Sequence, residues 1–424
     1  MRKFNWILCG TLLKFFFITN PLSSEEPFRP IQGEFPPIEK AHTYRGEVIF
    51  IDHTTRRGSI RVQSGGMFRR NSPNPFAMLP YGIIRYHGAP ADLRDIPLGT
   101  VMYAKGFLPP NPKISSVPVL PLNNKDRDMN HYRGVGTEPA ENHLISLEDE
   151  PSYCKRKGLT WKLKEIEFKN TEWLLSAIRS PEKDINTDAE PESFTLDAAT
   201  RIWRGRERLS PTDLMNEGIW SKQGKQNLKN QSVLIGLNYK PTPGGIFTRF
   251  HVTDIWLDES STQRAAQQQT EVHKAFIKGR WVPAFVNNVE YGKAGRATVT
   301  ITLFGGMDPK IYSDFKKGEK GYINASELTL KHTGAGYGPA HIASKGSIVS
   351  VEQQVEDIPF GNSGIQIKFD TDLIIEGIRK GRVVRIRPKS WPDVKLPREE
   401  CIWDHAIHHE DRFPTPAIFP KYKP

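Results

Sequence analysis

A histidine-rich segment near the C-terminus, "CIWDHAIHHED" (401–411), contains the residue types best suited to bind a metal ion. His405 and either His408 or His409 could share one face of a helix, and imidazole and carboxylate groups are ligands of Zn²⁺ and other transition metals. Metal sites normally take their ligands from separated, rigid elements, and the chain has no His-Glu-x-x-His motif. We therefore favour a solvated polar segment. The alternative is a metal site of His405, His408 and His409 that would support metal-assisted hydrolysis.

A second segment, "FGNSGIQIKF" (360–369), places a serine close to two glycines. It resembles the nucleophile loop of chymotrypsin-like proteases, in which a serine attacks and backbone amides stabilise the oxyanion. His341 is too close in sequence to be the base, and Ile365 stands where that family has glycine. Because Asn-Ser-Gly between strands is common turn chemistry, we predict a turn and no catalytic residues. The sequence also lacks phosphate-binding glycine loops and Cys-x-x-Cys pairs, so we expect no cofactor.

Basic and aromatic residues are interleaved in "TRIWRGRER" (200–208). On a strand, Arg201 and Trp203 would share one face and Ile202 would point to the other. OB-folds use such faces to stack bases or sugar rings, although a packed Trp203 with solvated arginines is the simpler expectation. The candidate binding residues, chosen for charge or aromatic character, are Arg85, Arg201, Trp203, Arg204, Arg206, Arg385 and Arg387.

The formal net charge of +11 suits an anionic partner. Basic residues cluster at 56–57, 69–70, 155–157, 204–208 and 379–389. Such clusters fit an anionic polymer of the cell envelope, an acidic polysaccharide or, as an alternative, nucleic acid. Solvated charge that serves only solubility is the simpler explanation.

The first residues have the layout of an export signal over 1–24. Arg2 and Lys3 precede two apolar runs, and small serines precede an acidic pair. Lys14 interrupts the apolar stretch, whereas a membrane span needs roughly 20 mostly apolar residues. We therefore expect a soluble exported protein, located in the periplasm, in the cell envelope or outside the cell, with no membrane span after cleavage.

Cys154 and Cys401 are the cysteines that would remain after such cleavage. In an exported protein they could form one disulfide, joining the middle of the chain to its end. Two separate buried thiols are an equally good expectation.

Four segments share an apolar-x-x-apolar-acid pattern, and they are VIFID, LKEIE, VNNVE and IVSVE, starting at residues 48, 163, 286 and 348. Short β-branched runs bounded by Gly, Asn and Asp predict hairpins. Short helices are expected at 90–96, 210–218 and 308–318, where turn and capping residues precede helix formers. About five short strands with one small helix is the layout of an OB-like barrel. Duplication of such a unit explains why the pattern returns.

The sequence therefore predicts a mainly β fold of tandem small OB-like β-barrels with short inserted helices and one longer connecting helix. Barrels are expected at 41–110, 159–258 and 281–398, the last with a second half-unit from 345. A linker or long surface loop would occupy 111–158, a helix capped by Ser260 would occupy 259–280, and a C-terminal tail would occupy 399–424.

The succession GEVIFID, RRGSIRV and FAMLPYGIIRYHGAPADLRDIPLGTVMYAKG, with TLFGGMDPKIY further on, resembles uncharacterised secreted proteins of planctomycete-type bacteria built from small OB-like β-barrel domains. The resemblance covers most of the mature chain, implies export and a barrel fold, and transfers no functional residues. Our leading hypothesis is an exported, non-enzymatic binding or scaffold protein of the cell envelope. The alternatives are an OB-like nucleic-acid-binding protein and a metal-assisted hydrolase.

Overall fold

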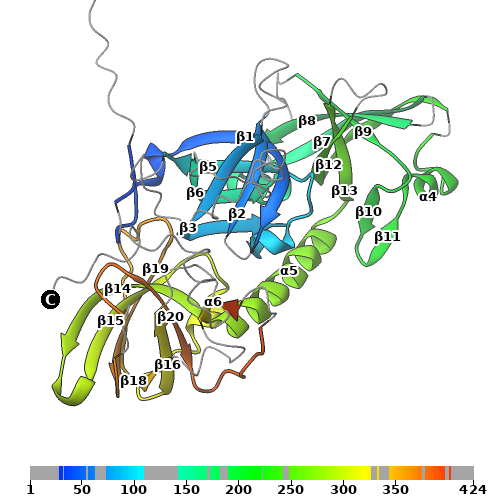
Figure 1. Cartoon of the computed structure of the whole chain (residues 1–424). Helices are drawn as coiled ribbons and strands as arrows, with labels where there is room; N and C mark the ends of the chain where they lie inside the picture. The colour runs from blue at the N-terminus through cyan, green and yellow to red at the C-terminus, as the bar shows by residue number, and fades with distance from the viewer. Residues whose placement is uncertain are drawn as a thin grey trace, which may run out of the picture.

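Three β-rich units and one long helix make up most of the described protein (Figure 1). The computed structural model describes residues 28–31, 33–53, 56–62, 73–108, 142–169, 172–181, 190–221, 223–241, 248–325, 332–333, 343–374, 378–396 and 401–402. We call the units barrel 1 (42–149), barrel 2 (159–256) and barrel 3 (282–388). In Figure 1 barrel 1 lies between the other two, and helix α5 runs along it from barrel 2 to barrel 3. The predicted mainly β fold of tandem small barrels is confirmed.

Barrel 1 is a ring of five strands that pair in the order β2-β1-β5-β6-β3, with β3 returning to β2. Strand β4 pairs with the end of β3, and the short helix η2 leads from β4 to β5. The interior is apolar, with Val48, Ile60, Met102 and Leu147 fully buried. The elements are β1 His42–Asp52, β2 Arg57–Val62, β3 Pro73–Tyr86, β4 Ala89–Ala91, η2 Leu93–Asp95, β5 Val101–Phe107 and β6 Asn142–Asp149, preceded by η1 Ile38–Lys40.

Barrel 2 has the same pairing order as barrel 1, except that two short strands replace one long strand. Its order is β8-β7-β12-β13, and β9 and β10 together take the place of the long β3. The pair Thr195 and His251 joins β9 to β13, and the hairpin β10–β11 corresponds to β3–β4. The elements are β7 Leu159–Lys169, β8 Glu172–Pro181, β9 Glu192–Leu196, β10 Arg201–Arg204, β11 Glu207–Leu209, α4 Pro211–Asn216, β12 Gly224–Pro241 and β13 Thr248–Trp256.

Barrel 3 is a closed ring of six antiparallel strands in the order β14-β15-β19-β18-β16-β20. Exchanging β14, β15 and β16 with β18, β19 and β20 leaves this order unchanged. The barrel therefore consists of two half-units, the second of which begins with β18. The elements are β14 Val282–Tyr291, η3 Lys293–Gly295, β15 Ala297–Phe304, α6 Pro309–Tyr312, β16 Lys320–Ala325, β18 Ser344–Gln353, β19 Asn362–Thr371 and β20 Val383–Pro388.

The repeated apolar-x-x-apolar-acid pattern coincides with an irregularity in the first strand of each hairpin. The pairing register shifts just after the first apolar residue, at Val48, Leu163, Val286 and Ile348. In three of the four, a glycine N–H donates to the carbonyl of that residue at 2.7 Å, and these glycines are Gly99, Gly381 and Gly318. Bulges bend and twist strands, which a small closed barrel requires.

Barrels 1 and 2 each end in an aspartate that caps the next helix. Asp149 begins α3 (Glu150–Lys157) and Asp258 begins α5 (Glu259–Arg280). Each carboxylate accepts two backbone N–H hydrogen bonds at 2.8–3.0 Å, one from its own helix and one from the tip of a hairpin. The donors to Asp149 are Ser152 and His87. The donors to Asp258 are Ser261 and Gly205. The cap therefore fixes the direction in which the chain leaves each barrel.

Part of the expected linker at 111–158 is regular structure. Residues 142–149 form β6, which pairs with both β3 and β5 in barrel 1, and 150–157 form α3. Helix α5 occupies the expected position, but Asp258 caps it in place of Ser260.

The predicted signal at 1–24 and most of the tail lie outside the described residues. Within the tail, β21 (Cys401–Ile402) pairs in parallel with β17 (His332–Thr333).

Candidate functional site

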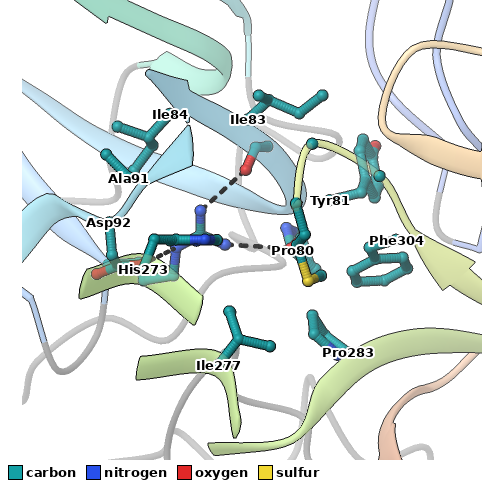
Figure 2. A pocket seen from close by; sticks show the side chains of 15 residues that line it. Pro80, Tyr81, Ile83, Ile84, Ala91, Asp92, His273, Ile277, Pro283 and Phe304 are labelled. Carbon is teal, nitrogen blue, oxygen red and sulfur yellow. Dashed lines mark hydrogen bonds and ion pairs between the residues drawn. The ribbon is translucent and has the colours of Figure 1, made fainter. Parts of the chain in front are cut away.

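A small cavity lies where barrel 1, α5 and barrel 3 meet (Figure 2). Barrel 1 contributes Tyr81 and Asp92, α5 contributes His273, and barrel 3 contributes Pro283 and Phe304. The cavity volume is about 40 Å³. Since one water needs roughly 10–15 Å³, this space admits a few waters but no polymer.

The polar wall of the cavity consists of Arg56, Asp92 and His273, all of which are buried. Arg56 donates to the carbonyls of Pro80 at 3.1 Å and Gly82 at 2.9 Å, and its Nε lies 3.7 Å from Asp92 Oδ2. Asp92 Oδ1 and His273 Nδ1 have no hydrogen-bond partner among the described residues. Both atoms therefore have hydrogen-bonding capacity left for water.

Burial sets the protonation of these three groups. It lowers the pKa of Arg56 and raises the pKa of Asp92, and their mutual attraction opposes both shifts. It also lowers the pKa of His273 to about 4, with a further contribution from the positive charge of Arg56. His273 is therefore uncharged at neutral pH. The described lining contains no serine, threonine, cysteine or lysine, and the polar wall of Arg56, Asp92 and His273 lies at the joint between barrels 1 and 3.

Aromatic packing closes the same joint. The ring of Phe35 lies 5.1 Å from that of Tyr81 in barrel 1 and 5.2 Å from that of Phe285 in barrel 3. Phe285 and Phe304 also pack edge to face at 4.9 Å. The segment before β1 therefore lies between two barrels and contacts both.

A second polar centre joins barrels 1 and 2, and it is built around Glu150 at the start of α3. The carboxylate is fully buried. Its Oε2 accepts from barrel 1, from Arg45 at 3.0 Å and Tyr103 at 2.8 Å. Its Oε1 accepts from Trp161 of barrel 2 and ion-pairs with Arg179, both at 3.0 Å. One carboxylate therefore binds each barrel with a separate oxygen.

Aromatic rings hold both arginines of this junction in place. The guanidinium carbon of Arg45 lies 4.5 Å from the centroid of Phe250, and that of Arg179 lies 4.7 Å from the Trp161 ring. Tyr103 and Tyr153 stack at 3.9 Å beside them. The two arginine side chains keep 16% and 21% of their surface exposed, so solvent reaches the edge of the junction.

The predicted aromatic–basic face forms on β10, but other protein groups occupy it. Ile202 points into the core of barrel 2, as the alternation required. Arg201 and Trp203 both donate to the buried carboxylate of Asp254, at 2.6 and 2.8 Å. The ring of His87, from the β3–β4 hairpin, packs edge to face on Trp256 at 5.0 Å, next to Trp203 in the ladder. This face therefore contributes to the contact between barrels 1 and 2.

The other candidate residues are dispersed. Arg204 is paired with Glu207 and Glu217 on the surface, while Arg206 is exposed at the hairpin tip. Arg85 is half-buried near the cavity, where its charge contributes to lowering the pKa of His273.

Arg385 and Arg387 are not surface residues, because their side chains are 0% and 2% exposed. Arg385 donates to the carbonyls of Arg280 and Trp281 at the end of α5, at 2.8 and 3.2 Å. Arg387 donates to the carbonyl of Trp391 at 2.7 Å. Cations near the end of a helix satisfy its last carbonyls and oppose its dipole, which explains the position of Arg385.

Three other kinds of residue were considered for chemistry: a serine, the cysteines and the C-terminal histidines. Ser363 lies at the start of β19 and its Oγ donates to the Leu303 carbonyl at 2.8 Å, consistent with a structural turn. Cys154 is a free buried thiol whose Sγ lies 3.4 Å from Glu150, which favours separate thiols over a bond to Cys401. His405, His408 and His409 lie outside the described residues.

One short sequence repeat marks the junction. Asp-Glu-x-Ser occurs at 149–152, starting at the last residue of β6, and again at 258–261, starting two residues after β13. That repeat would have identified the two helix caps. It would not have identified Arg45 or Arg179, whose roles depend on partners distant in sequence.

Comparison with protein-family models and with curated proteins finds no match. Within the described part of the chain, no helix is both long and apolar enough to cross a membrane. Among the described residues, no group of three His, Cys, Asp or Glu side chains is arranged to hold a metal ion.

Proposed function

We propose that this is an exported, non-enzymatic binding or scaffold protein of the cell envelope that holds an anionic polymer on a rigid frame of three barrels. The observation that carries the proposal is the Glu150 junction. A fully buried carboxylate that contacts donors from two barrels at fixed positions specifies how the two barrels pack against each other. Barrel 3 is held to barrel 1 by the aromatic contacts of Phe35 and by α5.

Charge supports an anionic partner. The full chain has a formal net charge of +11, and +8 remains after removal of Arg2, Lys3 and Lys14 with the predicted signal. Exposed basic side chains include Lys155 and Lys157 on α3 and Arg206 on the β10–β11 hairpin. The nucleic-acid alternative would stack bases on Trp203, whose indole N–H donates to Asp254 and which lies next to Trp256, where His87 of barrel 1 packs. We therefore propose the envelope polymer ahead of nucleic acid.

The experiment is a pull-down of envelope extract with the purified mature chain, followed by sugar, uronic acid and phosphate analysis of the bound polymer. We expect anionic polymer to be retained and released by salt, because screening weakens exposed charge contacts. Recovery of neutral polymer alone, or of none, would contradict the proposal.

A further inference from the structure

The pair Arg45 and Arg179 has donor capacity that the fold does not use. A guanidinium has five N–H donors, and Glu150 takes one contact from each of these two. The Nε atoms of both side chains are buried and have no hydrogen-bond partner among the described residues, so an external anion would contact the exposed edges of the two groups, which keep 16% and 21% of their side-chain surface. Because aromatic rings and Glu150 fix both groups, little side-chain entropy would be lost when an anion binds.

Glu192, at the start of β9, is a second acidic residue near these arginines, and its side chain is partly exposed to solvent. Its two oxygens lie 3.8 Å from Arg45 Nη1 and from Arg179 Nη2. Charge-assisted N–H···O bonds are about 2.7–2.9 Å long, so Glu192 neutralises the pair without hydrogen bonding to it. Its side chain is 38% exposed, so it can move aside into water.

We propose that Arg45 and Arg179 form a binding site for a carboxylate of an acidic polysaccharide, and that Glu192 competes for this site. The inference rests on the proposed function and names the chemistry of its ligand. Guanidinium forks match carboxylate geometry, and the site already accommodates the carboxylate of Glu150. The half-buried rings of Tyr103 and Phe250 lie beside the arginines, and small β-barrels use such rings to bind oligosaccharides.

The test is calorimetric titration of the full mature chain with oligogalacturonate, a polymer of carboxylate-bearing sugars. The substitution Glu192→Gln removes the competing charge and keeps the side-chain size. We expect it to tighten binding about fivefold, because an exposed ion pair contributes up to about 1 kcal/mol and 1.4 kcal/mol is tenfold. Arg45→Lys should weaken binding by a similar factor, since it loses the fork, and thermal unfolding checks that the variant folds.

The matched control is Glu207→Gln, which changes the net charge equally and frees a contact of Arg204 on another surface. It should leave the affinity unchanged. Equal tightening in both glutamine variants, or none in Glu192→Gln, would overturn the site while leaving the general function standing. Failure of the wild type and every variant to bind any anionic polymer would reject both the arginine site and the proposed function. Stronger binding of single-stranded DNA than of oligogalacturonate would reject the polysaccharide as the ligand and indicate nucleic acid.

Discussion

Replacing Glu150 with alanine should destabilise the junction of barrels 1 and 2 by about 3–5 kcal/mol, the range for removing one partner of a buried ion pair. The side chain is fully buried, accepts hydrogen bonds from Arg45, Tyr103 and Trp161, and forms an ion pair with Arg179. Its removal leaves two positive charges whose remaining counter-ion is the more distant Glu192, at 3.8 Å from each. Because Arg45 and Arg179 retain some access to solvent, we expect a value near the lower end, about 3 kcal/mol.

The assay is urea unfolding of the purified protein monitored by tryptophan fluorescence, since Trp161 lies within the junction. Hydrogen exchange measured on peptides then locates the loss, which should fall in barrels 1 and 2 and spare barrel 3. Glu207→Ala is the control and should cost under about 1 kcal/mol, because its pair with Arg204 is exposed. If Glu150→Ala lowered the free energy of unfolding by no more than the control does, the stabilising role of the Glu150 junction would be refuted.

Three further outcomes follow. The folded pKa of His273, about 4, lies below its unfolded value of about 6.5, so its contribution to stability is complete above pH 6.5 and is lost as the pH falls toward 4. When the pH falls from 7 to 5, the free energy of unfolding of the wild type should therefore drop by about 2 kcal/mol more than that of His273→Gln, measured by urea unfolding. An equal drop in both proteins would contradict this. Asp254→Ala should cost about 2 kcal/mol by the same measurement, because the buried acceptor of Arg201 disappears, whereas an unchanged midpoint would show that the contact is dispensable. Gly346→Ala should lower the melting temperature more than Gly318→Ala, because the new Cβ would clash with the backbone oxygen of Asp370, whereas Gly318 has open space around it and only an unfavourable φ of +84°. The reverse order of melting temperatures would refute the packing argument.

Local sequence patterns were sufficient to predict most strands of the barrel units, β6 excepted. Alternating apolar residues, glycine turns and capped short helices depend on neighbours in sequence, so β10, α4 and α5 lie where these patterns place them. The four repeated segments were recognised as hairpins, while their common bulge became visible only in the pairing register.

The roles of charged residues were harder to predict. Arg385 and Arg387 look like a surface cluster, yet the first binds carbonyls at the end of α5 and the second binds those after β20. A buried arginine needs acceptors. Those of Arg385 lie about a hundred residues away in sequence, where one sequence does not reveal them, whereas that of Arg387 lies four residues further along the chain. Strand β6 was missed for a related reason, because it pairs in parallel with β3 across a long stretch of chain.

The claim that a rigid cationic frame holds an anionic polymer is tested most directly by the affinity of the purified mature chain for anionic and neutral polysaccharides over a range of salt concentrations. Our account predicts binding to the anionic polymer at low salt, a steady loss of affinity as salt rises, and no binding to the neutral one. Equal affinity for both polymers, or no binding at low salt, would contradict it.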